Sequence, residues 1–403
     1  MKLKIADYFS VELILIVLSL ILFFYQYNNF TGLYFDEFHY VPAAKDLVSS
    51  LASTNLEHPP LGKIIIGMSI RIFGDGPLGW RAPSILFGMM TIILFFKIAQ
   101  NIFRDHLTAF LAGLLALTNM WIYIQSRIAM LDIFLLFFLL LGIYFYLKSR
   151  EKKSFVNDIL CFGSFGFATA VKWNAIFIFF PTIIFYFYEN RKIATTLILI
   201  LFSIVLYYLT FIPIYLSWKL NYSIQYIIFE LPFEMLRLQK SVIADHPYKS
   251  KWYTWPLMIR PIWYEYIKDS TGNYFRGVIL LGNPLQMLLG FFAVIYMIFK
   301  LLIKKINYFE LYFIFLFLCS WLVWALVPRG LQFFYYFFIP ASLYALIIPI
   351  WLSEMISVKR LNLILGIMVI ISTGFFIYFY PVISGNLTPE VVRLKWAWLN
   401  SWI

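Results

Sequence analysis

Long apolar runs, each close to 20 residues, recur along most of this chain. About 20 consecutive apolar residues are what a helix needs to cross the hydrocarbon core of a bilayer. The chain of 403 residues is 62% hydrophobic and only 13% charged, whereas soluble domains are roughly half apolar and about a quarter charged. The pattern therefore predicts an all-α polytopic membrane protein and excludes a soluble globular fold.

Basic residues between the runs predict the orientation of the chain. Cytoplasmic loops of membrane proteins are rich in Lys and Arg, and such residues follow alternate runs, most densely at 148–153. The first run lacks the small-residue cleavage pattern of a signal peptide, so we expect it to be retained. We predict a cytoplasmic N-terminus, an external C-terminus and about eleven spans, at 11–29, 82–103, 107–124, 133–147, 157–171, 175–188, 194–216, 285–302, 309–327, 333–352 and 361–380.

Two longer polar segments, 30–78 and 217–275, are predicted to lie on the external side. The first contains two short amphipathic stretches, Val41–Leu51 and Leu61–Phe73, which are too short and too charged to span and are expected to lie along the interface. No sequence repeat divides the chain. Residues 1–403 are therefore predicted to form one membrane domain with two external segments.

The net charge of +12 is larger than orientation alone requires, because many Lys and Arg residues fall on the predicted external side. Each of them has a simple alternative explanation, which is contact with anionic lipid headgroups. Taken together, and in apolar surroundings, they favour an external pocket for a lipid-linked phosphate.

Titratable residues gather directly after the first span, at Asp36, Glu37, His39, Glu57 and His58. A carboxylate at the membrane boundary is a reasonable general base for a hydroxyl, because partial desolvation raises its basicity. The alternative is an interfacial charge pair at the end of a helix. The nearby histidines and Glu57 favour a catalytic loop.

The motifs Phe35–Ala44 and Glu57–Lys63 resemble the first external loop of protein O-mannosyltransferases, which use dolichyl- or polyprenyl-phosphate mannose and have the multi-span GT-C fold. The resemblance covers most of the chain, because further motifs follow in the same order. These are Gly79–Ser84, Ser126–Asp132, Lys172-Trp173, His246–Leu257, Arg260-Pro261, Gly282–Pro284, Pro328-Arg329 and Phe334–Tyr336.

The resemblance implies roles for individual positions. Asp36 matches the proposed catalytic base, and Glu37 matches the neighbouring acid associated with acceptor binding. Related aminoarabinose transferases have Lys-Pro-Pro where this chain has a His-Pro-Pro motif, which implies that His58 lies near the phosphate. The implied donor or phosphate-binding residues are His58, Lys63, Arg81, Arg127, Asp132, Lys172, Arg260 and Arg329. The implied acceptor or loop residues are His39, His246, Tyr248 and Trp252.

The expected activity is transfer of a sugar, with mannose as the expected one, from a polyprenyl or dolichyl phosphate to an acceptor hydroxyl. Basic residues would stabilise the phosphate leaving group, and a single displacement would invert the anomeric centre. Protein Ser or Thr is the expected acceptor. Segment 217–275 is too short for the folded domain of eukaryotic members, so a prokaryotic enzyme at the outer face of the cell membrane is expected.

Other interpretations stay open. The acceptor could be a glycolipid or cell-wall lipid, as in aminoarabinose transferases. A transporter or flippase is disfavoured, because its ionisable groups would lie near the bilayer midplane in paired repeats. No cofactor is expected to be required; Glu57 and His246 are weak candidates for a divalent metal, and their spacing matches no recognised metal pattern. Partners other than donor, acceptor and membrane, including nucleic acid, are not expected, and the oligomeric state is open.

Overall fold

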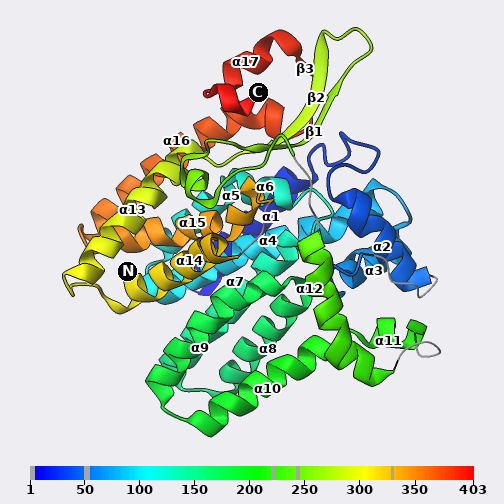
Figure 1. Cartoon of the computed structure of the whole chain (residues 1–403). Helices are drawn as coiled ribbons and strands as arrows, with labels where there is room; N and C mark the ends of the chain where they lie inside the picture. The colour runs from blue at the N-terminus through cyan, green and yellow to red at the C-terminus, as the bar shows by residue number, and fades with distance from the viewer. Residues whose placement is uncertain (1–4, 50–54, 219–222, 242–245, 328–330) are drawn as a thin grey trace.

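The computed structural model describes residues 5–49, 55–218, 223–241, 246–327 and 331–403 (Figure 1). The described residues form a mostly helical, multi-pass membrane fold. The longer helices are α1 (Ile5–Phe24), α4 (Pro77–Phe103), α5 (His106–Leu117), α7 (Asp132–Lys152), α8 (Phe155–Val171), α9 (Ile176–Asn190), α10 (Ile193–Leu209), α13 (Pro284–Leu302), α14 (Tyr308–Leu326), α15 (Phe338–Ser353) and α16 (Val358–Ile383).

Each of the eleven predicted spans overlaps one of these helices. Within the described ranges, six helical segments are long and apolar enough to cross a membrane: Pro77–Phe103, Asp132–Lys152, Pro284–Leu302, Tyr308–Leu326, Phe334–Ser353 and Val358–Ile383. Four shorter apolar helices accompany them, at Val11–Phe24, His106–Leu117, Phe155–Val171 and Ile193–Leu209. The helical membrane fold is confirmed, and the count of eleven crossings stays a prediction.

Basic residues end several helices on the side predicted to be cytoplasmic. Arg104, Lys153 and Arg191 follow α4, α7 and α9 and adopt the left-handed conformation that closes a helix C-terminus. A positive charge there also complements the helix dipole. The basic turns that suggested an orientation are therefore helix ends.

The predicted span 107–124 is wrong as a continuous helix. Asn119 separates α5 from α6 (Met120–Gln125), because its side chain accepts hydrogen bonds from the amides of Trp121 (3.0 Å) and Ile122 (3.3 Å) and so caps a new helix. Its amide group also donates to Gln286 Oε1 on α13 (3.1 Å). The break thus connects two helices that are far apart in the sequence.

The first external segment folds into α2 (Glu37–Ser49) and α3 (Leu61–Phe73). The bounds predicted for α3 are confirmed. The predicted start of α2 at Val41 is wrong, because the helix begins four residues earlier and Pro42 lies inside it; the predicted end at Leu51 lies outside the described residues. The earlier start places Glu37 and His39 on the helix.

The second external segment contains α11 (Ile212–Trp218), a π-helical turn η2 (Tyr226–Glu230), α12 (Leu231–Ser241), the 3-10 helix η3 (Trp252–Leu257) and the hairpin strands β1 (Ile262–Lys268) and β2 (Tyr274–Leu280). With β3 (Thr388–Pro389) these strands form an antiparallel sheet of order β1-β2-β3. The sheet is an addition to the helical fold that sequence reasoning did not include. It lies beside α17 (Arg393–Trp396) at the end of the molecule that carries the C-terminus (Figure 1).

Candidate active site

Asp36 stands immediately before α2. Its carbonyl accepts hydrogen bonds from the amides of His39 (2.9 Å) and Tyr40 (3.0 Å), so the helix starts from this residue. The preceding residue, Phe35, has a φ of +53°. A carboxylate at a helix N-terminus is stabilised as an anion by the helix dipole. Asp36 is half-buried, and His39 on the next turn is exposed.

Glu37, the adjacent acid, has a different environment. Its fully buried carboxylate accepts from Arg81 Nε and Nη2, both at 2.8 Å, and from the amides of Ala129 (2.8 Å) and Tyr34 (3.2 Å). These bonds join α2, α4 and the turn before α7. Glu37 is therefore held as an anchor of the segment that carries Asp36, and its implied part in acceptor binding stays a prediction.

Arg81 is also fully buried, and all five of its N–H donors have acceptors. Besides Glu37, it donates to the carbonyls of Tyr27 (3.3 Å), Phe30 (2.6 Å) and Gly32 (2.7 Å). A guanidinium with this many partners has no donor left for a phosphate. The geometry gives Arg81 a structural role in shaping residues 27–37, rather than the donor contact that the resemblance implied.

Arg127 likewise binds backbone. It donates to the carbonyls of Phe23 (3.2 Å) and Tyr25 (2.7 Å) at the end of α1, and to the hydroxyl of Tyr123. The last carbonyls of a helix lack intrahelical partners, and a cation there is favourable. Arg127 thus fixes the end of the first span to the turn between α6 and α7.

Asp132 and Lys172 form a second buried ion pair, with 2.7 Å between Lys172 Nζ and Asp132 Oδ2. Asp132 is the first residue of α7, and Lys172 directly follows α8. Lys172 Nζ lies 5.9 Å from the centre of the Tyr40 ring. The pair therefore lies next to the first turn of α2.

Two tyrosines connect this pair to Asp36. Burial raises the pKa of the Tyr40 phenol well above its usual value, and the charges of Asp36 and Asp132 add to the effect. Burial is also the main cause of the raised pKa of Tyr264 on β1, and again Asp132 and Asp36 add to it. Distances agree with this, because Lys172, the partner of Asp132 on α7, lies beside Tyr40 on α2, and Tyr264 on β1 is stacked on Phe35, the residue before Asp36. The segments that carry these residues therefore meet at one site.

The His-Pro-Pro loop lies against the same turn. The His58 ring is 6.0 Å from the Tyr40 ring, and the carbonyls of His58 (2.9 Å) and Asn55 accept from Lys63 Nζ. Lys63 is fully buried, which lowers the pKa of its ammonium from 10.5 to about 7, although the Glu57 carboxylate opposes the shift. Lys63 therefore holds the loop in place.

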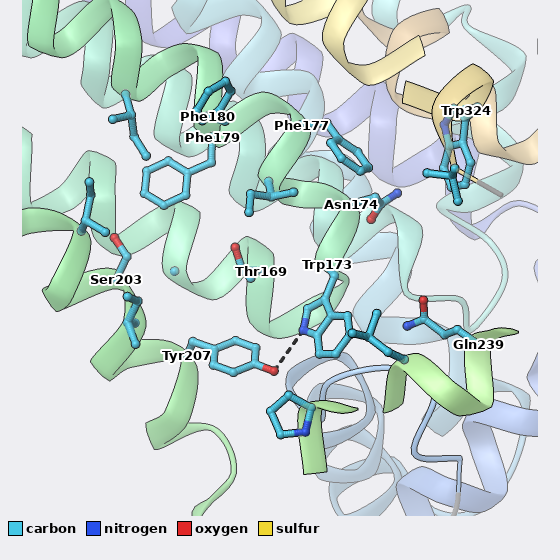
Figure 2. Close-up of a pocket in the computed structure, with 18 of the residues that line it drawn as sticks. Thr169, Trp173, Asn174, Phe177, Phe179, Phe180, Ser203, Tyr207, Gln239 and Trp324 are labelled. Carbon is cyan, nitrogen blue, oxygen red and sulfur yellow. Dashed lines mark hydrogen bonds between the residues drawn. The ribbon is translucent and has the colours of Figure 1, made fainter. Parts of the chain in front are cut away.

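A cavity of about 1260 Å³ lies between α8, α9, α10 and α12 (Figure 2). Most of its walls are apolar, formed by side chains such as Phe177, Phe180 and Trp324. Gly166 lets α8 approach α10 closely, because a Cβ there would lie 2.7 Å from the Ser203 carbonyl oxygen. Drug-sized ligand pockets usually measure about 300–1,000 Å³, so this cavity suits a long apolar molecule.

The cavity begins next to the second ion pair. Trp173, the residue after Lys172, lines it and donates a hydrogen bond to the Tyr207 hydroxyl (3.0 Å; Figure 2). Gln239 on α12 also lines it and donates to the carbonyl of Glu57 (2.5 Å) in the His-Pro-Pro loop. Lys240 and Lys249 add positive charge to the wall. An apolar cavity that begins beside Lys172 and Glu57 matches a lipid with a charged head.

Sequence reasoning missed the cavity and its lining. The Lys172-Trp173 motif pointed to one end of it, but Thr169, Tyr207 and Gln239 carried no separate signal. The cavity forms only where α8, α9, α10 and α12 pack together, so no local sequence motif indicates it.

The remaining predicted residues lie in the segment before β1. Arg260 donates to the carbonyls of Pro247 (3.0 and 2.5 Å) and Ser401 (3.3 Å), which ties this segment to the C-terminal tail. His246 Nδ1 accepts from the Tyr248 amide (3.2 Å), and the Trp252 ring packs against Trp321. Their implied roles stay predictions.

Arg329 lies outside the described residues. Among the residues that the structure describes, no group of three or more His, Cys, Asp or Glu side chains could hold a metal ion. A metal-binding role for Glu57 and His246 stays a prediction.

The fold is that of the GT-C class of membrane glycosyltransferases. It matches the structure of the S. cerevisiae protein O-mannosyltransferase Pmt1-Pmt2 complex bound to the sugar donor, with a TM-score of 0.78 at 11% identity, over 100% of this chain and 93% of that one. ArnT from Cupriavidus metallidurans bound to undecaprenyl phosphate matches with a TM-score of 0.59 at 15% identity, over 91% of this chain and 70% of that one.

Sequence comparison identifies the family. Residues 57–218 match the model for dolichyl-phosphate-mannose-protein mannosyltransferase, and residues 224–402 match the model for the C-terminal four-span region of protein O-mannosyltransferase. A polyprenol-phosphate-mannose–protein mannosyltransferase of Corynebacterium glutamicum is 32% identical over 203 residues, which cover 40% of this chain and 39% of that protein. The match thus spans about two fifths of the length of that relative. The chain belongs to the protein O-mannosyltransferase family.

Proposed function

We propose that this protein transfers mannose from a polyprenyl phosphate to the hydroxyl of an acceptor, with Ser or Thr of a protein as the acceptor. Family membership supports the reaction class, and the named relative supports the donor and acceptor. The single observation that carries the proposal is the meeting of three features: the Asp36 turn, the Asp132–Lys172 pair and one end of a large apolar cavity.

We infer one orientation for the donor, with its lipid chain in the cavity and its phosphate towards Lys172. Its polyprenyl chain would occupy the cavity between α8, α9, α10 and α12, where apolar walls replace lipid. Its phosphate would then lie near Lys172, at the end of the cavity that borders the active site. Sugar C1 would face Asp36.

Each group has a part in the chemical step. Asp36 takes the proton of the acceptor hydroxyl, and the hydroxyl oxygen forms a bond to C1 of the sugar. The bond between C1 and the phosphate oxygen breaks, and its electron pair leaves with the phosphate. The Lys172 ammonium stabilises that developing charge. Attack opposite the leaving group inverts the anomeric centre.

Orientation and cofactor need are part of the proposal. The active site would face outward across the cell membrane, with the N-terminus of α1 in the cytoplasm, because the basic helix ends lie at the opposite end of the bundle from α2, α3 and the sheet (Figure 1). Because side chains supply the base and the phosphate contact, we propose that the step needs no metal ion.

Labelled polyprenyl-phosphate mannose, offered to purified protein with Ser/Thr peptides or with membrane glycolipids, tests the proposal. Label in peptides, retained after treatment with EDTA, is the expected result. Label found only in glycolipids would show that the acceptor is a glycolipid and not a protein. Loss of activity with EDTA would overturn the proposal that the step needs no metal ion. Movement of the donor across the proteoliposome membrane without any mannosyl transfer would show that the protein is a transporter and not an enzyme.

A further inference from the structure

Phe35 adopts a backbone conformation that bulky residues rarely take. Its φ of +53° is in the left-handed region, where the Cβ of an L-residue is crowded by the backbone. The residue directly precedes Asp36, so its backbone angles set the direction in which the Asp36 side chain leaves the chain. Strained residues of this kind persist only where their surroundings hold them.

Two aromatic rings hold Phe35. Tyr264 on β1 is stacked on it, with 3.9 Å between the ring centres and 16° between the planes. Tyr335, on the 3-10 turn η4 (Phe334–Phe337), meets it edge-on at 5.9 Å and 86°. Edge-to-face contact, as between Tyr335 and Phe35, is one of the favoured geometries of aromatic pairs. Three segments that are distant in the sequence therefore meet at this ring.

The position of Tyr264 depends on an irregularity of the sheet. The register of β1 against β2 shifts between Trp263 and Glu265, which makes Tyr264 the extra residue of a β-bulge. Bulges redirect side chains and are frequent beside active sites. The buried Tyr264 hydroxyl also accepts a hydrogen bond from Gln125 Nε2 (2.8 Å) at the end of α6.

We propose that Tyr264 is a positioning residue for Asp36: stacked on Phe35, it holds the left-handed turn that points the carboxylate at the acceptor hydroxyl. This inference rests on the proposed function, because it assigns a role within the same site. The hairpin β1–β2 thereby becomes part of the active site, although it carries no reacting group. A residue that only packs would affect folding and leave the chemical rate unchanged.

The substitutions Tyr264→Leu and Tyr264→Phe separate the ring from its hydroxyl. Misplacing a reacting group by about 1 Å can reduce a rate by ~100-fold, so Tyr264→Leu is expected to lower kcat for mannosyl transfer by ~10- to 100-fold with the donor KM almost unchanged. Tyr264→Phe keeps the stacked ring and is expected to retain most of the activity. Measurements are made on the folded full-length protein at saturating donor and acceptor.

Tyr344→Leu is the matched control. Tyr344 on α15 is also a buried tyrosine stacked on a phenylalanine, Phe317, with 5.3 Å between the ring centres. Its substitution removes a comparable contact in the membrane core, so kcat of the folded fraction is expected to stay near that of the wild type. An unchanged kcat in Tyr264→Leu, or a loss no greater than in Tyr344→Leu, would overturn the positioning role.

A second measurement does not depend on transfer. Hydrogen exchange of the amides of residues 34–40 is expected to be faster in Tyr264→Leu than in the wild type or in Tyr344→Leu, because the turn loses its support. Unchanged exchange would overturn the proposal even if the wild type transferred no mannose. Absence of transfer in the wild type with faster exchange in the variant would refute the proposed function and leave the structural part standing.

Discussion

Two buried ion pairs lie close to Asp36, and they differ in how many N–H donors of the cation have a hydrogen-bond acceptor. Arg81, paired with Glu37, has an acceptor for each of its five N–H donors. Lys172, paired with Asp132, donates one hydrogen bond within the described part of the chain, although an ammonium has three donors. A saturated cation holds the fold, whereas a cation with donors left beside a cavity can bind a phosphate.

The same contrast separates the two adjacent acids. Glu37 faces inward and accepts four hydrogen bonds, while Asp36 is half-buried at the start of α2. Neighbouring positions in one motif therefore serve different ends. The Glu37–Arg81 pair stabilises the loop before α2, and we expect the Asp132–Lys172 pair to take part in the reaction.

Removing Arg81 should have the largest effect. Arg81→Met leaves Glu37 as an unpaired buried charge, and breaking such a pair costs about 3–5 kcal/mol. The variant is expected to yield little folded protein, as measured by size-exclusion chromatography and thermal unfolding in detergent. The double variant Glu37→Leu, Arg81→Met removes the unpaired charge and should recover part of the loss. Wild-type stability of Arg81→Met would show that the saturated pair does not hold the fold.

Lys172 should separate folding from activity. Lys172→Met leaves Asp132 unpaired and is expected to lower both the stability and the transfer activity. Combining Lys172→Met with Asp132→Leu should restore the stability. Transfer should stay about 100-fold below wild type in the double variant, because losing one preorganised charge contact typically costs 10²–10³ in rate. Recovery of activity together with stability would make this pair structural, like the first.

Filling the cavity should affect donor binding. Thr169→Trp is expected to raise the donor KM by about 10-fold, equivalent to ~1.4 kcal/mol, with a smaller change in kcat. Thr373→Trp on α16 is the matched control, because both threonines are half-buried and donate to the carbonyl four residues earlier. Equal KM values for the two variants would place the lipid chain elsewhere.

Lys63 should give a smaller, pH-dependent effect. Its folded-state pKa of about 7 lies below the unfolded value near 10.5, so between these values the unfolded chain binds more protons and stability rises with pH. Below pH 7 the contribution is constant. Between pH 7 and 9 the thermal midpoint is expected to rise by about 2 °C, and Lys63→Met should flatten this rise. An identical slope in the variant would contradict the assignment to Lys63.

Much of the helical fold could be predicted, because run length and basic turns depend on local sequence. The bounds of α3 followed from the Pro-Pro break before it and the end of its apolar pattern. The hairpin was missed although Ile262–Lys268 is rich in β-branched and aromatic residues and a turn containing Gly272 follows it. Its short strands lay within a segment read only as an external loop.

The site could be predicted in part. Resemblance singled out Asp36, Lys172 and Arg81 alike, because a motif records residue type and order. It could not show that the N–H donors of Arg81 are all hydrogen-bonded to Glu37, 44 positions earlier, and to three carbonyls. Saturation and cavity shape depend on which helices meet, and those contacts are made across the whole chain.

The central claim is that Asp36 is the base for transfer from a lipid phosphate. Single-turnover transfer by folded Asp36→Asn protein, loaded with labelled polyprenyl-phosphate mannose, tests it most directly. Loss of a general base typically costs 10²–10⁴ in rate, so the rate is expected to fall by about that factor while donor binding and thermal stability stay near wild type. A transfer rate close to wild type in the folded variant would contradict the account.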